Sequence, residues 1–175
     1  MGSMQEDPTR AIWRRLGETL AGSFAARARG LLAYEFAIQG RRGVEIGLLR
    51  TNGARGAVFE AGDLEARIER YWPAGYTMLS GGAKILAARP MDALNTPEIR
   101  CLDRLYRGHL SLLRNTAEAG PAGGEATVRV TGGLTNRNYE VVFDASDEGS
   151  LPVALFLLYL TTALRRKAYN VVHRA

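Results

Sequence analysis

Two clusters of basic side chains are the residues of this sequence best suited to binding a ligand. Arg41 and Arg42 lie in a glycine-flanked turn, and Arg165, Arg166 and Lys167 follow a long apolar stretch. Guanidinium and ammonium groups hold phosphates and carboxylates through charge-assisted hydrogen bonds. We therefore take these five residues as candidates for binding an anion or an anionic lipid headgroup. The alternative for each cluster is solvated surface charge.

The overall charge agrees with an anionic partner without requiring one. Lys and Arg number 23 against 18 Asp and Glu, a net charge of +5, and Lys84 and Lys167 are the only lysines. Such a charge favours contact with an anionic lipid or with the acidic surface of a protein partner. Nucleic-acid binding is not expected, because aromatic residues make up only 8% of the chain and no nucleic-acid-binding motif is present.

The sequence offers no set of catalytic or metal-binding residues. Cys101 and His109 are separated by eight positions, a spacing that defines no nucleophile and base. Two histidines without a carboxylate cluster do not predict a zinc site. Asp144, Asp147 and Glu148 lack the alternation and the glycine of a calcium loop, and we expect them to serve the start of the following helix. We predict no enzyme activity, no metal and no cofactor.

A single cysteine excludes an intramolecular disulfide framework, which suits a reducing compartment. Met1 to Met4 read as an expression-tag remnant before a native Met4, and no secretory signal follows. We expect a cytoplasmic protein, peripheral at the membrane surface if the basic clusters bind lipid.

The most informative element is the apolar run from Leu151 to Leu164. Its 14 residues would form a helix about 21 Å long, too short for a bilayer core of about 30 Å. The run is apolar around its whole circumference, and such a helix is buried on every side. A sheet that curls around the helix would bury all of its faces at once. The alternative is a short hydrophobic anchor in a membrane or in another subunit.

The rest of the chain is typical of an antiparallel sheet with glycine-containing turns. Alternating patterns predict strands near residues 34–39, 44–48, 57–60, 64–69, 76–79, 84–88, 127–131 and 139–143. Ala66, Ile68, Val142 and Ile46 are the expected inward-facing residues. Residues 98–115 fit either a helix or a hairpin, and Gly108 favours strands. Residues 117–124 are expected to form a loop.

These elements predict a β-rich α+β fold: a closed antiparallel β-barrel that encloses a hydrophobic C-terminal α-helix, with an extra N-terminal helix. The N-terminal helix runs from Thr9 to Leu20, with Asp7 as its cap and Pro8 in its first turn. We divide the chain into residues 1–23 (tag remnant and helix), a single barrel domain at 24–170, and a tail at 171–175.

The order of features over residues 24–167 resembles the tubby C-terminal-like superfamily, particularly LURP-one-related domains, to which phospholipid scramblases are similar in fold. The matching segments are Gly43-Val44-Glu45-Ile46-Gly47, Asn138 to Phe143, and Leu151 to Leu164. The resemblance implies a closed barrel threaded by a hydrophobic helix, and it suggests a bacterial member. Tubby domains bind phosphoinositides through basic side chains, which implies a lipid or anion role. The metal-binding and lipidated cysteine segments of scramblases are absent.

Together, the residues and the resemblance predict a non-enzymatic tubby-like domain that binds anionic phospholipid or an acidic partner surface. Two alternatives stay open: a protein-interaction module and a barrel that carries a small ligand. A central helix would fill the interior that a carrier needs. The sequence leaves the oligomeric state undetermined.

Overall fold

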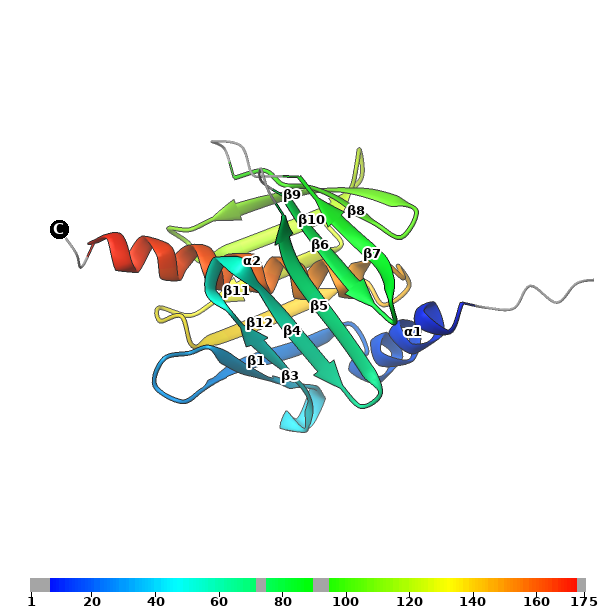
Figure 1. The fold of residues 1–175 in the computed structure, drawn as a ribbon, viewed down its shortest axis with the longest axis horizontal. Helices are drawn as coiled ribbons and strands as arrows, with labels where there is room; N and C mark the ends of the chain where they lie inside the picture. The colour runs from blue at the N-terminus through cyan, green and yellow to red at the C-terminus, as the bar shows by residue number, and fades with distance from the viewer. Residues whose placement is uncertain (1–6, 72–74, 90–94, 173–175) are drawn as a thin grey trace, which may run out of the picture.

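The chain folds into twelve antiparallel strands that close into a barrel around one long helix, with a second helix against the end of the barrel (Figure 1). The computed structural model describes residues 7–71, 75–89 and 95–172. Its elements are α1 (Pro8–Leu20), β1 (Ser23–Arg29), β2 (Glu35–Gln39), the 3₁₀ turn η1 (Arg41–Gly43), β3 (Glu45–Thr51), the 3₁₀ turn η2 (Gly53–Arg55), β4 (Gly56–Ala61), β5 (Leu64–Tyr71), β6 (Gly75–Ser80), β7 (Ala83–Ala88), β8 (Glu98–Cys101), β9 (Arg104–Ser111), β10 (Thr116–Pro121), β11 (Val128–Gly132), β12 (Asn138–Phe143) and α2 (Ser150–Val172). The predicted fold class is confirmed.

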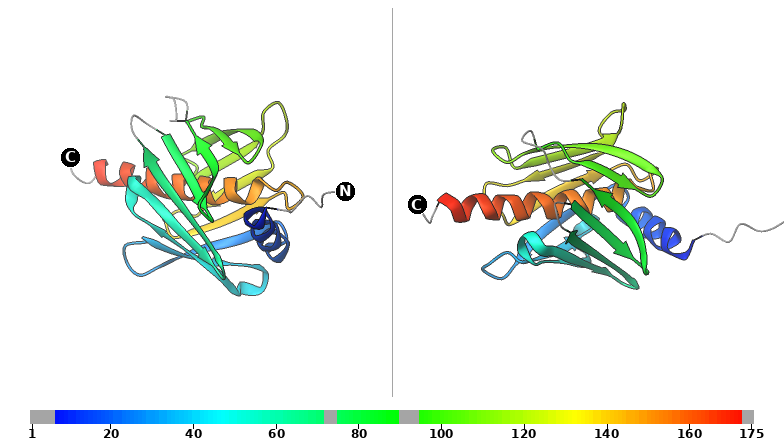
Figure 2. Two further views of the ribbon diagram at one scale, coloured as in Figure 1. Left: turned by 45° about the vertical axis from the view of Figure 1, so that its right-hand side comes forward. Right: turned by 45° about the horizontal axis from the view of Figure 1, so that its top comes forward.

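The strand order fixes which connections share an end of the barrel. Each strand pairs with its neighbours in sequence, and β1 pairs with β12 to close the sheet. The chain therefore alternates between the two ends, and α2 runs through the interior after β12. The connections β1–β2, β3–β4, β9–β10 and β11–β12 lie where α2 emerges, as do the last residues of β5 and β7; we call this the loop end. α1 lies against the opposite end (Figures 1 and 2).

The interior of the barrel is filled by α2. Every side chain from Leu151 to Ala163 is buried, and Phe156 has no exposed surface. Tyr76 on β6 contacts Phe156 edge-on with ring centroids 5.6 Å apart. Tyr159 donates a hydrogen bond from its hydroxyl to the carbonyl of Gly53 at 3.0 Å, which ties α2 to the barrel wall. The prediction of a helix enclosed by protein on every side is confirmed.

The N-terminal helix also forms as predicted. The Asp7 side chain accepts the backbone N–H of Thr9 at 2.9 Å, and Pro8 occupies the first turn. Trp13 is buried beside Phe59 and donates its indole N–H to the Ser80 hydroxyl at 3.1 Å. These contacts hold α1 across the end of the barrel at which α2 begins.

Several local predictions need correction. Residues 98–115 contain β8 and β9, so the preference for strands is confirmed, but residues 117–124 were wrongly expected to be a loop, because β10 covers Thr116–Pro121. The inward-facing residues of β10 are Ala117 and Ala119, and α2 packs closely against this strand. Small residues leave room for the helix there. They also remove the hydrophobic alternation that signals a strand.

Two further differences concern side-chain direction and element length. Ala66 and Ile68 face inward as predicted, and Ile46 is half-buried, but Val142 is 57% exposed while Val141 is buried. Val141, Val142 and Phe143 are all apolar, so the sequence does not show which of them face the interior. The pairing of β12 with β1 and β11 fixes the inward-facing residues. The sequence analysis also missed β1, and α2 continues to Val172, beyond the predicted end at Leu164.

Candidate functional site

The structure places the two predicted basic clusters at opposite ends of the barrel. Arg41 and Arg42 lie in η1 between β2 and β3, and Arg41 donates to the carbonyl of Ala21 at 3.2 Å, directly after α1. Arg165, Arg166 and Lys167 lie on α2 at the loop end. Strands of five to seven residues, roughly 17–23 Å, separate the two ends. A single site formed by all five residues is therefore not assembled.

At the loop end, further cations join the α2 cluster. Arg55 follows from η2, Arg70 from the end of β5, Arg114 from the β9–β10 turn and Arg137 from the β11–β12 turn. Among the described residues, none of these seven cations forms an ion pair with a carboxylate. Sequence analysis missed the four additional arginines, because they are 110 to 28 positions away from the α2 cluster along the chain and converge only through the barrel topology.

The arginines of the barrel wall behave differently. Arg27 pairs with Glu140 and Arg29 with Glu45, and Arg129 lies 3.5 Å from Glu118. Arg50 and Arg67 have glutamate partners as well. Positive charge on these strands is therefore matched locally by carboxylates. At the loop end, Arg89 lies 3.6 Å from Glu98, whereas the seven cations above have no carboxylate partner among the described residues.

Three loop-end arginines are oriented by backbone carbonyls, which leave their charge intact. Arg137 donates to the carbonyls of Gly30 at 2.8 Å and Leu31 at 3.3 Å, and Arg165 donates to the carbonyl of Leu134 at 3.0 Å. Arg166 donates to the Ala33 carbonyl and to the Thr51 hydroxyl.

Arg166 is the most enclosed of the predicted site residues. Its guanidinium carbon lies 4.1 Å from the centre of the Tyr34 ring, a cation–π contact. Burial lowers the pKa of Arg166 from its ordinary value, but arginine keeps its proton in proteins. This side chain links α2 to the β1–β2 loop, whereas Arg165 and Lys167 are more open to a ligand.

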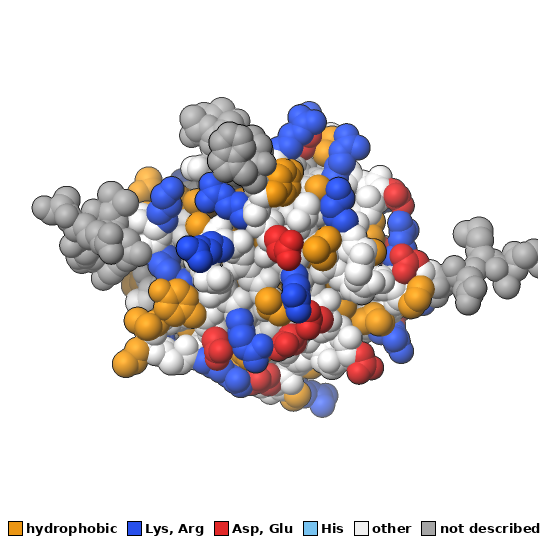
Figure 3. All heavy atoms as spheres, viewed as in Figure 1, with side chains coloured by type: hydrophobic (Ala, Val, Ile, Leu, Met, Phe, Trp, Pro, Cys, Tyr) orange, Lys and Arg blue, Asp and Glu red, His pale blue; other side chains and the backbone are white. Residues whose placement is uncertain are grey.

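Large apolar side chains also gather at the loop end. Leu31, Leu32, Leu113 and Leu134 all project from turns there and are largely exposed. Figure 3 shows hydrophobic and basic side chains side by side at this end of the molecule. Sequence analysis did not single out these leucines. The sequence feature that could have identified them is an isolated leucine, or a pair of leucines, within an otherwise polar or glycine-containing turn.

Cys101 and His109 do not form a nucleophile and a base. Cys101 on β8 points into the core with no exposed surface, and burial together with the nearby Asp147 raises the pKa of its thiol to about 12. His109 on β9 points outward and is exposed. The two side chains therefore lie on opposite faces of the sheet.

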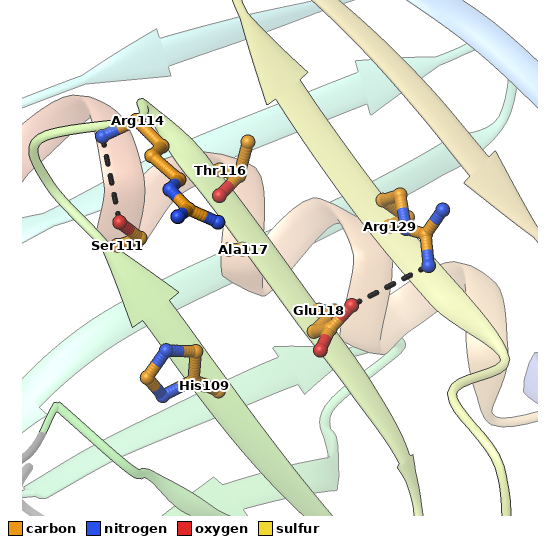
Figure 4. Close-up of a pocket in the computed structure, with 7 residues that line it drawn as sticks. All are labelled: His109, Ser111, Arg114, Thr116, Ala117, Glu118 and Arg129. Carbon is orange, nitrogen blue, oxygen red and sulfur yellow. Dashed lines mark hydrogen bonds and ion pairs between the residues drawn. The ribbon is translucent and has the colours of Figure 1, made fainter.

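The outer face of β9–β11 carries a groove of about 630 Å³ that includes His109 (Figure 4). Ser111 accepts the backbone N–H of Arg114 at 3.4 Å, and among the described residues no hydrogen bond joins it to His109. Glu118 is held by Arg129 at 3.5 Å. The groove lacks an activated nucleophile, and its free Arg114 guanidinium belongs to the loop-end cations.

A second polar cluster supports the start of α2. Asp147 is buried, accepts the Tyr106 hydroxyl at 2.8 Å, and lies 3.2 Å from Arg104. Ser150 donates to the Asp147 carbonyl at 2.9 Å, and Asp144 accepts from Ser146. These acids stabilise the turn before the helix, as predicted. Within the described residues, no group of His, Cys, Asp or Glu side chains is arranged to hold a metal ion.

The comparisons with known proteins add no relative. No family model matches the chain, and neither a curated protein nor a solved structure matches it.

In the part of the chain that the structure describes, neither helix combines the length and the apolar character needed to cross a bilayer.

Proposed function

We propose that this protein is a non-enzymatic, tubby-like barrel that binds anionic phospholipid surfaces through its loop end. A closed antiparallel barrel around a hydrophobic C-terminal helix is the fold that the tubby resemblance implies, and this supports the assignment. The helix occupies the interior that a small-ligand carrier would use. The proposal places the protein in the cytoplasm, peripheral at a membrane.

The observation that carries the proposal is the group of seven cations without carboxylate partners at the loop end. The seven cations come from five separate segments that meet at this end of the barrel, and among the described residues none is paired with a carboxylate. A basic residue near an anionic membrane contributes about 1 kcal/mol. Several such residues on one face give an attraction that falls off within a Debye length and weakens with salt.

The two basic clusters allow a matched test, because each offers one arginine bonded to a single backbone carbonyl and one cation with no partner in the described part of the chain. Arg165 bonds to Leu134 and Arg41 to Ala21, while Lys167 and Arg42 are exposed. The double variant Arg165→Gln/Lys167→Gln therefore loses the same charge as Arg41→Gln/Arg42→Gln, but at the opposite end. Arg166 is left unchanged because it also braces the β1–β2 loop.

The measurement is co-sedimentation with phosphatidylcholine vesicles that contain phosphatidylserine, over a salt series. We expect the wild-type chain to bind at low salt and to dissociate as salt rises. Removing two cations at the loop end should weaken binding by about 2 kcal/mol, about 30-fold. The variant at the α1 end should bind as the wild type does. Absence of binding at low salt, or equal losses in both variants, would contradict the proposal.

A further inference from the structure

Exposed apolar side chains are concentrated at one end of the barrel. Eight large hydrophobic residues are exposed among those described, and six of them lie at the loop end. Four are leucines at the tips of turns: Leu31 is 96% exposed, Leu32 73%, Leu113 101% and Leu134 98%. We call these four the leucine rim. Full exposure of several leucines on one face marks an interaction surface.

The leucine rim belongs to three neighbouring turns that are held together. β1 pairs with β12 and β9 with β10, so the β1–β2, β11–β12 and β9–β10 turns follow one another around the barrel. Arg137 bonds the first two turns to each other through the Leu31 carbonyl, and the Asn115 side chain donates to the Gly133 carbonyl at 2.9 Å. The three turns that carry the leucines are therefore held in place by one another.

We propose that the leucine rim inserts into the acyl boundary of an anionic bilayer while the neighbouring arginines remain at the headgroup level. This inference rests on the proposed function and names how the bound state is anchored. Stable attachment to a membrane surface commonly takes two signals, an apolar group and a basic patch, and the loop end has both. Arginine stems also cover apolar surface while their charged ends stay in water.

The spacing of the cations fits this arrangement. Arg114 directly follows Leu113, and Arg137 lies three residues after Leu134 in the same turn. The headgroup region of a leaflet is about 5–7 Å thick, which is about two residues of extended chain. With the leucines below the phosphates, these guanidinium groups would therefore lie at phosphate depth.

A bilayer fits the leucine rim better than a folded protein partner. The four leucines stand on three separate turns, two of which also carry Arg114 and Arg137, and α2 leaves the barrel at the same end (Figure 1). A protein partner would need a surface that matches each projection at interior-like packing density. Fluid lipid accommodates separate projections without such matching, and its negative charge complements the unpaired cations.

Substitution of leucine leaves every charge in place, so the apolar contribution can be measured separately. The test variant is Leu113→Ala/Leu134→Ala, and the matched control is Val44→Ala/Val142→Ala, whose side chains are 58% and 57% exposed away from the loop end. Binding is measured to the vesicles of phosphatidylcholine and phosphatidylserine. We expect the leucine variant to lose at least tenfold in affinity with an unchanged salt slope, because several methylene groups leave the membrane. The valine control should stay within about twofold.

A fluorescent label at Leu134→Cys reports insertion directly. Cys101 is buried, and its raised thiol pKa of about 12 keeps it from reacting with the label. We expect the emission of the label to shift to the blue with these vesicles and to be quenched by nitroxides on the lipid acyl chains.

The outcomes separate the two proposals. If the wild-type chain fails to bind anionic vesicles at low salt, the proposed function is overturned, and the insertion with it. If the wild-type chain binds but the leucine variant matches the valine control and the label is not quenched, only the insertion is overturned. A blue shift without vesicles, together with a dimer in light scattering that the leucine variant abolishes, would instead make the leucine rim an interface between two copies.

Discussion

Replacing Phe156 by alanine should destabilise the barrel more than any substitution on its surface. Phe156 lies at the middle of the enclosed part of α2 with no exposed surface, and its ring meets Tyr76 edge-on at 5.6 Å. Truncation of a buried Phe to Ala costs about 3–5 kcal/mol, and an aromatic pair adds about 0.5–1.5 kcal/mol. For a chain of this length, about 3–5 kcal/mol corresponds to a melting temperature lower by roughly 6–20 °C.

The assay is urea unfolding followed by circular dichroism, with the free energy of unfolding compared at equal m values. Phe156→Leu is the first control, because it keeps most of the volume and should lose much less stability. Leu113→Ala is the second control, and as a surface substitution it should change the free energy of unfolding by no more than about 0.5 kcal/mol. A loss below about 1 kcal/mol for Phe156→Ala would show that α2 is not the packed centre of the barrel.

Two other predictions concern the same core. A chain that ends at Ser150 lacks the side chains that fill the barrel, so it should show no cooperative unfolding transition; a cooperative melt of that chain would make α2 an appendage. Alkaline stability should also be limited, because burial raises the pKa values of the Cys101 thiol and the Tyr139 phenol to about 12 from ordinary values of 9.0 and 10.0. Since the unfolded chain releases these protons first, the free energy of unfolding should be constant below about pH 9 and should fall as the pH rises toward 12, by up to about 1.4 kcal/mol per pH unit for each group. In pH-dependent urea titrations, Tyr139→Phe should flatten the decline between pH 10 and 12, and an unchanged slope would refute this origin.

The architecture was predictable because its main determinant is local in the sequence. The run from Leu151 to Leu164 is apolar on every face, and such a helix is stable in water only when other parts of the protein bury all of its faces. The strands that alternate large and polar residues were also found, as at Leu64–Tyr71. β10 was missed because the strand faces α2 with Ala117 and Ala119. It also contains Gly120, which could not carry a side chain, because its Cβ would lie 2.1 Å from the Glu125 carbonyl oxygen. A strand built from small residues shows little alternation between large apolar and polar side chains.

The candidate site was less predictable because it depends on topology. Arg41 and Arg165 occupy opposite ends, since an even number of antiparallel strands separates η1 from α2 and the helix then crosses the whole barrel. One strand more or fewer between them would put the two clusters at the same end, and β10, one of these strands, was not predicted from the sequence. The exposed leucines were also unpredictable for this reason. In the sequence each one is an isolated apolar residue or pair in a turn, and only the pairing of the strands brings these turns together.

The claim that the loop end faces an anionic membrane is tested most directly by hydrogen–deuterium exchange of the wild-type chain with and without phosphatidylserine-containing vesicles. The account predicts that vesicles slow exchange at residues 30–34, 112–115 and 133–137, and leave residues 40–44 at the α1 end unchanged. Protection at residues 40–44, or vesicle binding without protection of the three loop-end turns, would contradict it.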